Sequence, residues 1–275
     1  MEADSPHASY PDLSGKVALI MGIGQTAVPN STKWGNGAAI AYRLSQNHVK
    51  IFGCDLSIEA AKNTQSRLPG QCDVMVADVT SAADVSKVVS ACLDKHGRID
   101  ILVNNVGFPI LGDAVTLPEE AWDKQISVNL KSVYLACHFV LPVMEKQRSG
   151  TIINNASIAG LRYLGKPQIA YNSAKAAVIH FTQVTAAEFA SKGITLNCVV
   201  PGLILTPLVE KWEHSDSETE RRMFHKLTNS NVPMGKMGTG FDVANAVLFL
   251  SSEGARYMTG QSLILDGGLV VSTGT

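Results

Sequence analysis

Residues 16–55, KVALIMGIGQTAVPNSTKWGNGAAIAYRLSQNHVKIFGCD, form the stretch that decides the fold. A short apolar run leads to Gly22, Gly35 and Gly37 open a helical stretch, and a second apolar run ends at Asp55. Short apolar runs are typical of buried parallel strands, and a glycine-rich turn that opens a helix can aim main-chain N–H groups at a pyrophosphate. The stretch therefore predicts strand, phosphate-binding turn, helix and strand. A plain turn is the alternative for the glycines.

The same alternation continues along the whole chain. Apolar runs lie at 17–21, 49–53, 72–76, 101–104, 151–154, 195–200 and 262–265, and helical stretches lie at about 37–47, 58–68, 82–96, 119–145, 170–191 and 241–251. Alternating elements of this kind build an α/β fold, a doubly wound parallel sheet with helices on both faces and its ligand crevice at the carboxyl ends of the strands. We predict a single domain, residues 13–275, after a flexible N-terminal extension, residues 1–12.

Composition narrows the possible functions. The chain has 275 residues, 45% of them hydrophobic and 17% charged, with a formal net charge of -1. Such a chain can bury a core as one domain, and its charge gives no case for a nucleic acid or an anionic membrane as partner. No apolar run approaches the ~18 residues of a membrane span, and the polar N-terminus does not read as a signal peptide. The five cysteines lack metal-ligand spacing, so we expect reduced thiols, no metal and a cytoplasmic location.

A tyrosine and a lysine one helical turn apart are the candidate catalytic pair. Tyr171 and Lys175 stand in the run YNSAK, after Asn129 and Ser157. A free tyrosine, with a pKa of about 10, is a poor base at neutral pH, and a nearby ammonium would stabilise the phenolate and lower that pKa. Tyr171 can then exchange a proton with an alcohol or carbonyl oxygen held by Ser157, while a nicotinamide takes or gives the hydride. In isolation, such a pair would read as a surface pair.

Further motifs follow in a fixed order along the chain. They are Asp78-Val79, Asn104-Asn105-Val106-Gly107, Asn197, Pro201-Gly202, Thr206 and Asp266-Gly267-Gly268. With the glycine-rich turn and the catalytic pair, this order resembles the short-chain dehydrogenase/reductase family over residues 13–270. The resemblance implies a Rossmann-type fold and NAD(P)(H)-dependent interconversion of a secondary alcohol and a ketone.

The resemblance also assigns the catalytic residues. They would be Asn129, Ser157, Tyr171 and Lys175. Asn129 would hold a water that links Lys175 with solvent, and Lys175 would also bond the nicotinamide ribose. A structural amide inside a helix is the alternative for Asn129.

By the same resemblance, fifteen residues would bind the cofactor. They are Gly22, Gly35, Asn36, Gly37, Asp55, Asp78, Val79, Asn104, Gly107, Tyr171, Lys175, Pro201, Gly202, Ile204 and Thr206. A carboxylate at the position of Asp55 accepts hydrogen bonds from the adenosine ribose and repels a 2′-phosphate, so NAD(H) is favoured over NADP(H). Lys33 can offset that repulsion and admit NADP(H). Asp55 could instead cap the helix near Ser57, and Asp78-Val79 could be an ordinary strand end.

Two spacings depart from the family pattern. Twelve residues, 23–34, separate Gly22 from Gly35, where the family has three. The insertion 24–34 is either a surface excursion or a flap over the cofactor with Lys33 and Trp34 as contacts. Thirteen residues, 158–170, separate Ser157 from Tyr171, one more than the commonest family spacing, which reshapes the pocket beside them.

The segment 203–231 serves the family as a substrate-binding loop. Its mixture of apolar and charged residues suggests an amphipathic lid, and a mainly apolar, mid-sized alcohol or ketone as substrate. The expected substrate contacts are Phe108, Ser157, Arg162, Tyr163, Tyr171, Trp212 and Phe224. A solvated loop is the alternative for Arg162 and Tyr163. His138 and His180 read as core or interface residues.

Two long helices, 119–145 and 170–191, carry more apolar residues than one sheet face can cover. Relatives pair these helices across twofold axes, so we predict a homotetramer, with a dimer as the alternative. Two other functions stay open. One is a catalytically silent NAD-binding regulator, against which the intact quartet argues. The other is a non-redox isomerase or cyclase on the same fold, for which the enlarged glycine loop is the sequence reason.

Overall fold

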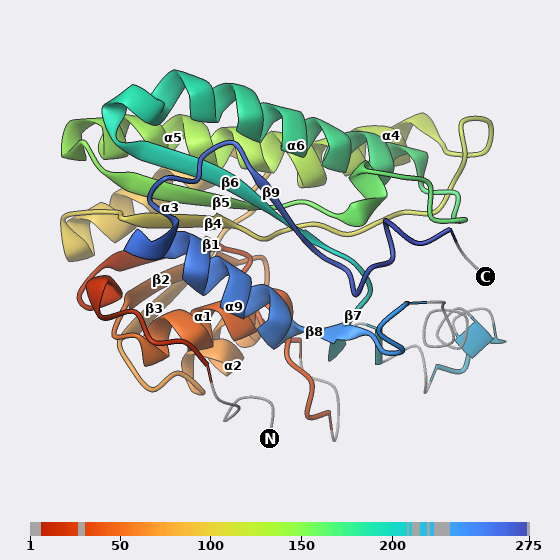
Figure 1. Ribbon diagram of the computed structural model, residues 1–275, viewed down its shortest axis with the longest axis horizontal. Coiled ribbons are helices and arrows are strands. Elements are labelled where there is room, and N and C mark those ends of the chain that lie inside the picture. Colours follow the sequence, from red (N-terminus) through yellow and green to blue (C-terminus); the bar gives the residue numbers. More distant parts are fainter. Residues whose placement is uncertain are drawn as a thin grey trace.

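Seven parallel strands form the central sheet in the order β3-β2-β1-β4-β5-β6-β9 (Figure 1). The computed structural model describes residues 7–26, 31–207, 209–210, 215–218, 221–222 and 232–273. The strands are β1 (Val17–Met21), β2 (Lys50–Asp55), β3 (Cys72–Val76), β4 (Ile101–Asn104), β5 (Gly150–Asn155), β6 (Ile194–Pro201) and β9 (Ser262–Leu265). The strand order reverses between β1 and β4, and in open α/β sheets the ligand crevice lies at such a switch point.

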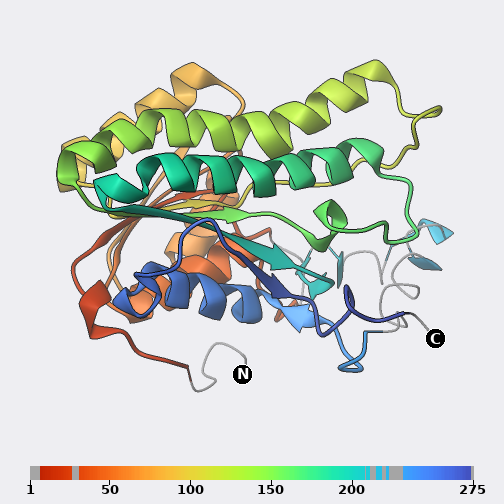
Figure 2. The same cartoon turned by 45° about the horizontal axis from the view of Figure 1, so that its top comes forward.

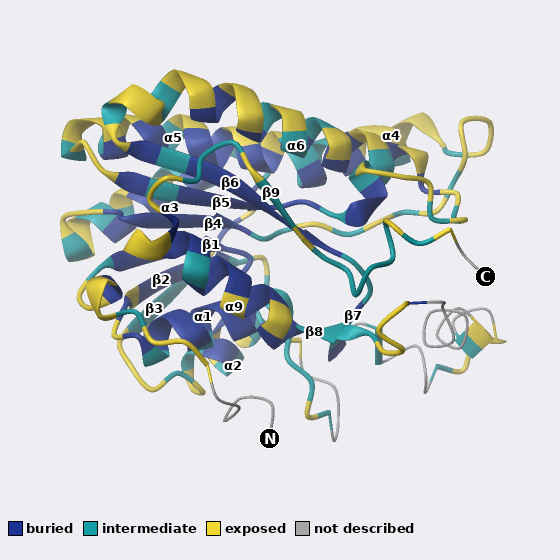
Figure 3. Ribbon diagram, viewed as in Figure 1, coloured by how far each residue is buried: buried dark blue, intermediate teal, exposed yellow. Residues whose placement is uncertain are grey.

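Helices cover both faces of the sheet (Figures 1 and 2). On one face lie α1 (Asn36–Gln46), α2 (Ile58–Gln65) and α9 (Gly240–Ser251), and on the other lie α3 (Ala82–His96), α4 (Glu119–Ile126), α5 (Ser132–Gln147) and α6 (Ile169–Phe189). Successive strand side chains point to opposite faces, so Leu19 packs in one apolar layer and Ile20 in the other. Figure 3 shows the buried sheet between the two helical layers. The predicted doubly wound α/β fold is confirmed.

Most predicted elements coincide with the structure. The strands at 17–21, 72–76, 101–104 and 262–265 and the helix at 82–96 have the predicted bounds, and the other elements shift by up to three residues at either end. The exception is the helix predicted over 119–145. It is divided by a π-helical turn, Ser127–Lys131, into α4 and α5. A short pair of strands, β7 (Ile204–Leu205) and β8 (Gly238–Thr239), was not predicted.

The helical segment Glu119–Gln147 is long and apolar enough, by length and composition, to cross a membrane. The core helix of a soluble protein passes the same test, and 44% of its most apolar 18-residue window is buried inside the protein. In the structure α5 packs against α3 and against strands β4 and β5. We therefore interpret the segment as a core helix of this fold.

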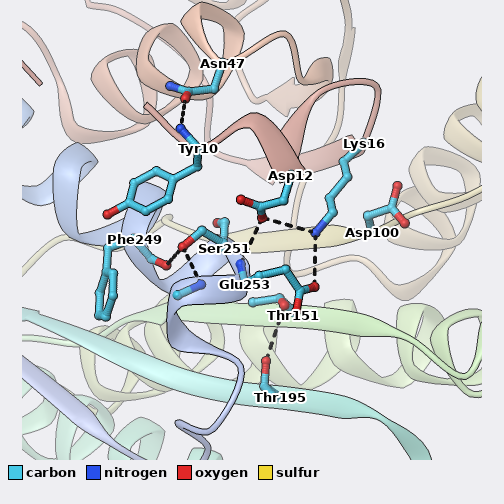
Figure 4. Close-up of polar contacts among 12 residues, drawn as sticks. Tyr10, Asp12, Lys16, Asn47, Asp100, Thr151, Thr195, Phe249, Ser251 and Glu253 are labelled. Carbon is cyan, nitrogen blue, oxygen red and sulfur yellow. Dashed lines mark hydrogen bonds and ion pairs between the residues drawn. The ribbon is translucent and has the colours of Figure 1, made fainter. Parts of the chain in front are cut away.

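The described part of the N-terminal extension contacts the domain (Figure 4). The main-chain N–H of Tyr10 donates to Asn47 Oδ1 at 2.8 Å, and the N–H of Glu253 donates to Asp12 Oδ2 at 2.9 Å. The Lys16 ammonium lies 3.9 Å from Asp12 and 4.0 Å from Glu253. These contacts join residues before β1 to the residues that follow the C-terminal ends of α1 and α9.

Candidate active site

A cavity of about 330 Å³ lies at the carboxyl ends of the strands. Its lining comprises Gly24, Thr26, Gly35, Asn36, Asn105, Gly107, Asn155, Ala156, Ser157, Tyr171, Lys175, Pro201, Gly202, Ile204, Thr206 and Pro207. Nine of the fifteen predicted cofactor residues are among them, together with Ser157. The cavity therefore brings together residues from the glycine-rich turn, from the ends of β4, β5 and β6, and from α6.

The first two turns of α6 carry Tyr171 and Lys175. The Lys175 ammonium lies 5.7 Å from the centre of the Tyr171 ring and donates a 2.7 Å hydrogen bond to the main-chain carbonyl of Asn155. Ser157 follows β5, where it opens a short 3-10 turn, Ile158–Gly160. A Cβ on Gly160 would lie 2.6 Å from the N atom of Ala176, so the glycine allows this turn to lie directly against α6.

Burial dominates the electrostatics of the pair. It raises the pKa of Tyr171 above its usual 10, and a hydrogen bond with Ser157 acts in the opposite direction. Burial also lowers the pKa of Lys175 to about 8. The net shift of the Tyr171 pKa is therefore upward, opposite in direction to the lowered pKa that the nearby ammonium led us to expect. The ammonium donates to the Asn155 carbonyl, and burial of the phenol is the largest cause of the shift.

Asn129 lies behind the cavity and does not line it. Its side chain is completely buried in the π-helical turn, where Oδ1 accepts from the N–H of Phe108 and Nδ2 donates to the carbonyl of Phe108, each at 3.2 Å. A Cβ on Gly107 would lie 2.7 Å from Asn129 Oδ1 and 2.9 Å from Lys175 Nζ. The Asn129 amide therefore holds the loop after β4 through Phe108. Gly107 lies next to both the Asn129 amide and the Lys175 ammonium. Single π-helical turns are frequent at functional sites.

The two asparagines after β4 point to different sides. Asn104, a predicted cofactor residue, donates through Nδ2 to Asn154 Oδ1 at 2.8 Å inside the core and does not line the cavity. Asn105 lines it instead, and its Nδ2 donates to the Gly22 carbonyl at 2.8 Å. Because strand residues alternate between faces, one of two neighbouring asparagines must face away. Asn105 is thus the member of the pair that faces the cavity, and the predicted role of Asn104 in cofactor binding stays a prediction.

Gly22 and Gly37 allow α1 to approach the end of β1 closely. Gly22 has φ +86°, and a Cβ on Gly37 would lie 2.0 Å from the Gly22 carbonyl oxygen. No side chain caps α1 at Gly35, and an uncapped helix N-terminus is a natural site for a phosphate. Asn36, in the first turn and in the cavity wall, has a buried Oδ1 without a hydrogen-bond partner among the described residues. The turn therefore fits a pyrophosphate although Gly22 and Gly37 themselves do not line the cavity.

The buried side chain of Gln25 joins the two ends of the insertion. Its Oε1 accepts from the N–H of Gly35 at 2.8 Å, and its Nε2 donates to the Lys33 carbonyl at 3.0 Å. The Trp34 ring packs at 5.1 Å from the ring of Tyr42 and 5.4 Å from that of Phe241. Trp34 therefore packs against α1 and α9 in this structure. Residues 27–30 lie outside the described part of the chain.

Asp55 holds the start of the insertion. Its Oδ2 accepts from the N–H of Gly24 at 2.9 Å, and its Oδ1 accepts from the N–H of Ser57 at 3.2 Å. A Cβ on Gly24 would lie 2.5 Å from Oδ2, so this contact requires glycine. The N-cap of α2 is Ser57 and not Asp55, because the Ser57 hydroxyl accepts from the N–H of Ala60. Asp55 itself does not line the cavity.

Asp78 and Val79, two predicted cofactor residues, are not part of the cavity wall. The exposed carboxylate of Asp78 accepts from the hydroxyl of Thr80 at 2.7 Å and from its N–H at 2.8 Å, and these bonds lower the pKa of Asp78. Val79 is buried in the apolar layer. These contacts are compatible with an ordinary strand end, and the cofactor role of the two residues stays a prediction.

Of the other predicted substrate residues that the structure describes, Phe108, Arg162 and Tyr163 are not part of the cavity wall. The Arg162 guanidinium donates to the carbonyls of Leu269, Val270 and Ser272, so it binds the C-terminal segment. Tyr163 is exposed, and the Phe108 ring lies 5.9 Å from the Lys124 ammonium. Trp212 and Phe224 lie outside the described residues.

His138 and His180 are exposed, so both lie outside the core. His138 stacks near Tyr134 on the outer face of α5. Among the residues that the structure describes, no group of three or more His, Cys, Asp or Glu side chains could hold a metal ion.

Known proteins resemble the chain in sequence and in structure. A family model described as enoyl-(acyl carrier protein) reductase matches residues 31–270. The 3-oxoacyl-acyl-carrier-protein reductase FabG of Thermotoga maritima is 37% identical over 94% of this chain and 99% of its own length. The 2-(R)-hydroxypropyl-CoM dehydrogenase of Xanthobacter autotrophicus is 34% identical over 88% of this chain and 97% of its own. A crystal structure described as a short-chain dehydrogenase/reductase from Burkholderia xenovorans has a TM-score of 0.88 at 39% identity and covers 96% of this chain and 99% of its own.

Proposed function

Because the chain belongs to the short-chain dehydrogenase/reductase family, we propose that it interconverts a secondary alcohol and a ketone with NAD(P)(H). The observation that carries the proposal is the convergence of Ser157, Tyr171 and Lys175 on one cavity with an uncapped helix N-terminus. A relative named a reductase and another named a dehydrogenase support both directions of the reaction. Both act, by name, on oxygen-bearing carbon substrates.

The catalytic side chains act on the oxygen of the substrate. Ser157 hydrogen-bonds this oxygen and orients the carbon, and Tyr171 delivers or accepts the proton there. A bound nicotinamide would supply or take the hydride. The raised pKa of Tyr171 keeps the phenol protonated, which suits a proton donor for ketone reduction. Alcohol oxidation requires the Lys175 ammonium to come closer to the phenol, because the phenolate then gains a compensating charge.

Residues of the cavity wall would hold the cofactor. The uncapped first turn of α1 would bind the pyrophosphate, and Lys175 would bond the nicotinamide ribose. Thr206, also in the cavity wall, would hold the carboxamide of the nicotinamide. The close approach of Gly37 to the Gly22 carbonyl shapes this turn, because any Cβ there would fill the space that brings α1 to the strand.

Asp55 supports NAD(H) as the preferred cofactor. Its carboxylate lies at the end of β2, beside the glycine-rich turn, where it would repel a 2′-phosphate. Its two bonds to main-chain N–H groups keep the carboxylate in place. Each oxygen retains capacity for a further hydrogen bond, so the adenosine ribose can still be bound.

The substrate we propose is a mainly apolar, mid-sized alcohol or ketone. Among the described residues of the cavity wall, Lys175 is the sole charged side chain, and it serves the cofactor. Arg162, the other candidate clamp, is bound to the C-terminal carbonyls. We also propose a homotetramer, and a cytoplasmic location, which five unpaired cysteines support.

A panel of secondary alcohols and ketones, assayed with NAD(H) and NADP(H) by nicotinamide absorbance, tests the proposal. We expect turnover on at least one apolar pair and a higher efficiency with NAD(H). Product that forms without net change in absorbance would instead indicate a non-redox isomerase or cyclase. Tight NAD binding without turnover on any pair would indicate a silent regulator.

A further inference from the structure

Asn155 lies between the glycine-rich turn and the catalytic lysine. It is the last residue of β5, its side chain is 8% exposed, and it lines the cavity. Its Nδ2 donates to Asn105 Oδ1 at 2.9 Å, and its main-chain carbonyl accepts from Lys175 Nζ at 2.7 Å. Three hydrogen bonds thus run from the Gly22 carbonyl through the two asparagines to Lys175.

The direction of these bonds is fixed by chemistry. The Gly22 carbonyl can only accept, so Asn105 must turn its NH₂ group toward it and its Oδ1 toward Asn155. Asn155 must then present its own NH₂ group to Asn105. Its Oδ1 is left buried, without a partner among the described residues. A buried polar atom of this kind is costly, which is the mark of a residue kept for a site rather than for stability.

We infer that Asn155 is a positioning residue, which holds the Lys175 ammonium where it can bind the nicotinamide ribose. The inference rests on the proposed function. Its side chain ties the end of β5 to the end of β4, and this fixes the direction of the carbonyl that the ammonium contacts. An apolar side chain at this position would leave Asn105 Oδ1 without this partner and would free that carbonyl to rotate.

Three ligands that share the adenosine part test the inference by calorimetry. ADP lacks the terminal ribose, ADP-ribose has it, and NADH adds the nicotinamide. For Asn155→Leu we expect ADP affinity to stay within about twofold, and affinities for ADP-ribose and NADH to fall about tenfold. The pH above which NADH affinity declines should also move down by about half a unit or more, because the ammonium loses a partner. Asn155→Ser, which is smaller, gives the same comparison if the leucine variant does not fold.

Asn197→Leu is the matched control. Asn197 is a buried asparagine on β6 whose amide bonds Met258 and Gln261 and which does not line the cavity. This variant should lower the melting temperature and leave the ratio of the three affinities unchanged. If Asn155→Leu weakens ADP as much as ADP-ribose, or weakens neither, the inference is wrong. If the wild type binds neither NADH nor NADPH, the proposed function has failed, which is a separate outcome.

Discussion

The Lys175 ammonium donates to the main-chain carbonyl of Asn155 at 2.7 Å. Only 2% of the surface of Lys175 is exposed to solvent. A buried cation with one carbonyl partner is poorly compensated, and burial lowers the pKa of Lys175 to about 8. The lysine that the chemistry requires is therefore a group that weakens the fold at neutral pH.

Lys175→Met should stabilise the protein without cofactor at pH 7. The unfolded chain keeps a lysine pKa near 10.4, so between about pH 8 and that value the unfolded state binds a proton that the folded state does not. The free energy of unfolding of the wild type therefore rises with pH in this window. The variant's advantage, up to about 3 kcal/mol at pH 7, should disappear by about pH 10.5. Denaturant titration checks this, with the exposed Lys87→Met as control. If Lys175→Met is more stable than the wild type by the same free energy at pH 7 and at about pH 10.5, the stability difference does not come from a buried charge.

Tyr171→Phe keeps the ring and removes the exchangeable proton. Turnover should fall at least ~100-fold, because the phenylalanine ring has no proton to exchange with the substrate oxygen. NADH affinity, measured by fluorescence, should stay within a few fold. Activity close to that of the wild type would remove Tyr171 from the mechanism.

Asp55 has two tasks that two substitutions can separate. Asp55→Asn removes the charge and keeps an oxygen for the N–H of Gly24, so the preference for NAD(H) over NADP(H) should fall about tenfold or more while the insertion stays anchored. Asp55→Ala removes both the charge and the oxygen that accepts from Gly24, so the affinity for NAD(H) and for NADP(H) should drop. Calorimetry with the two cofactors provides the measurement. A wild type that already prefers NADP(H) would show that the carboxylate does not select the cofactor.

Gln25→Leu removes the amide that joins the ends of the insertion and changes the side-chain volume little. The N–H of Gly35 and the carbonyl of Lys33 lose their partners, so the start of α1 should loosen and NADH affinity should fall about tenfold. Gln261→Leu, at an exposed position beside β9, is the control. An unchanged dissociation constant would mean that the insertion plays no part in cofactor binding.

The outer faces of α5 and α6 support the predicted homotetramer. Tyr134 is 49% exposed, Val184 46% and Ile169 39%, and a partner subunit on these helices would cover them. Light scattering at micromolar concentration should give a tetramer, and Val184→Arg should shift the mass toward smaller species. A stable monomer in the wild type would overturn the assembly.

Periodicity was sufficient for the fold, and the catalytic pair was proposed from its spacing together with the family motifs around it. The strand at 17–21 and the placement of Tyr171 and Lys175 on one helix face depend on local patterns, which a sequence displays directly. Contacts between distant side chains do not leave such a pattern. Gln25 bonding Gly35, and Arg162 bonding the C-terminal carbonyls, depend on how loops meet in three dimensions.

The pKa of Tyr171 shifts in the direction opposite to the predicted one because the side chain is buried. Proximity of Lys175 favoured a low pKa for Tyr171, but the sequence could not show that the phenol is desolvated or that the ammonium binds the Asn155 carbonyl. The π-helical turn at Asn129 was missed for a similar reason, because it interrupts an apolar helical pattern without glycine or proline to mark it.

Hydride transfer itself tests the central claim most directly. A single turnover with NADH deuterated at the transferable C4 position, on the best ketone of the panel, should place one deuterium on the carbinol carbon and lose one equivalent of nicotinamide absorbance. The same turnover with Tyr171→Phe should be slower by at least ~100-fold. Product without deuterium, or product formed while the nicotinamide absorbance stays constant, would contradict an alcohol and ketone oxidoreductase.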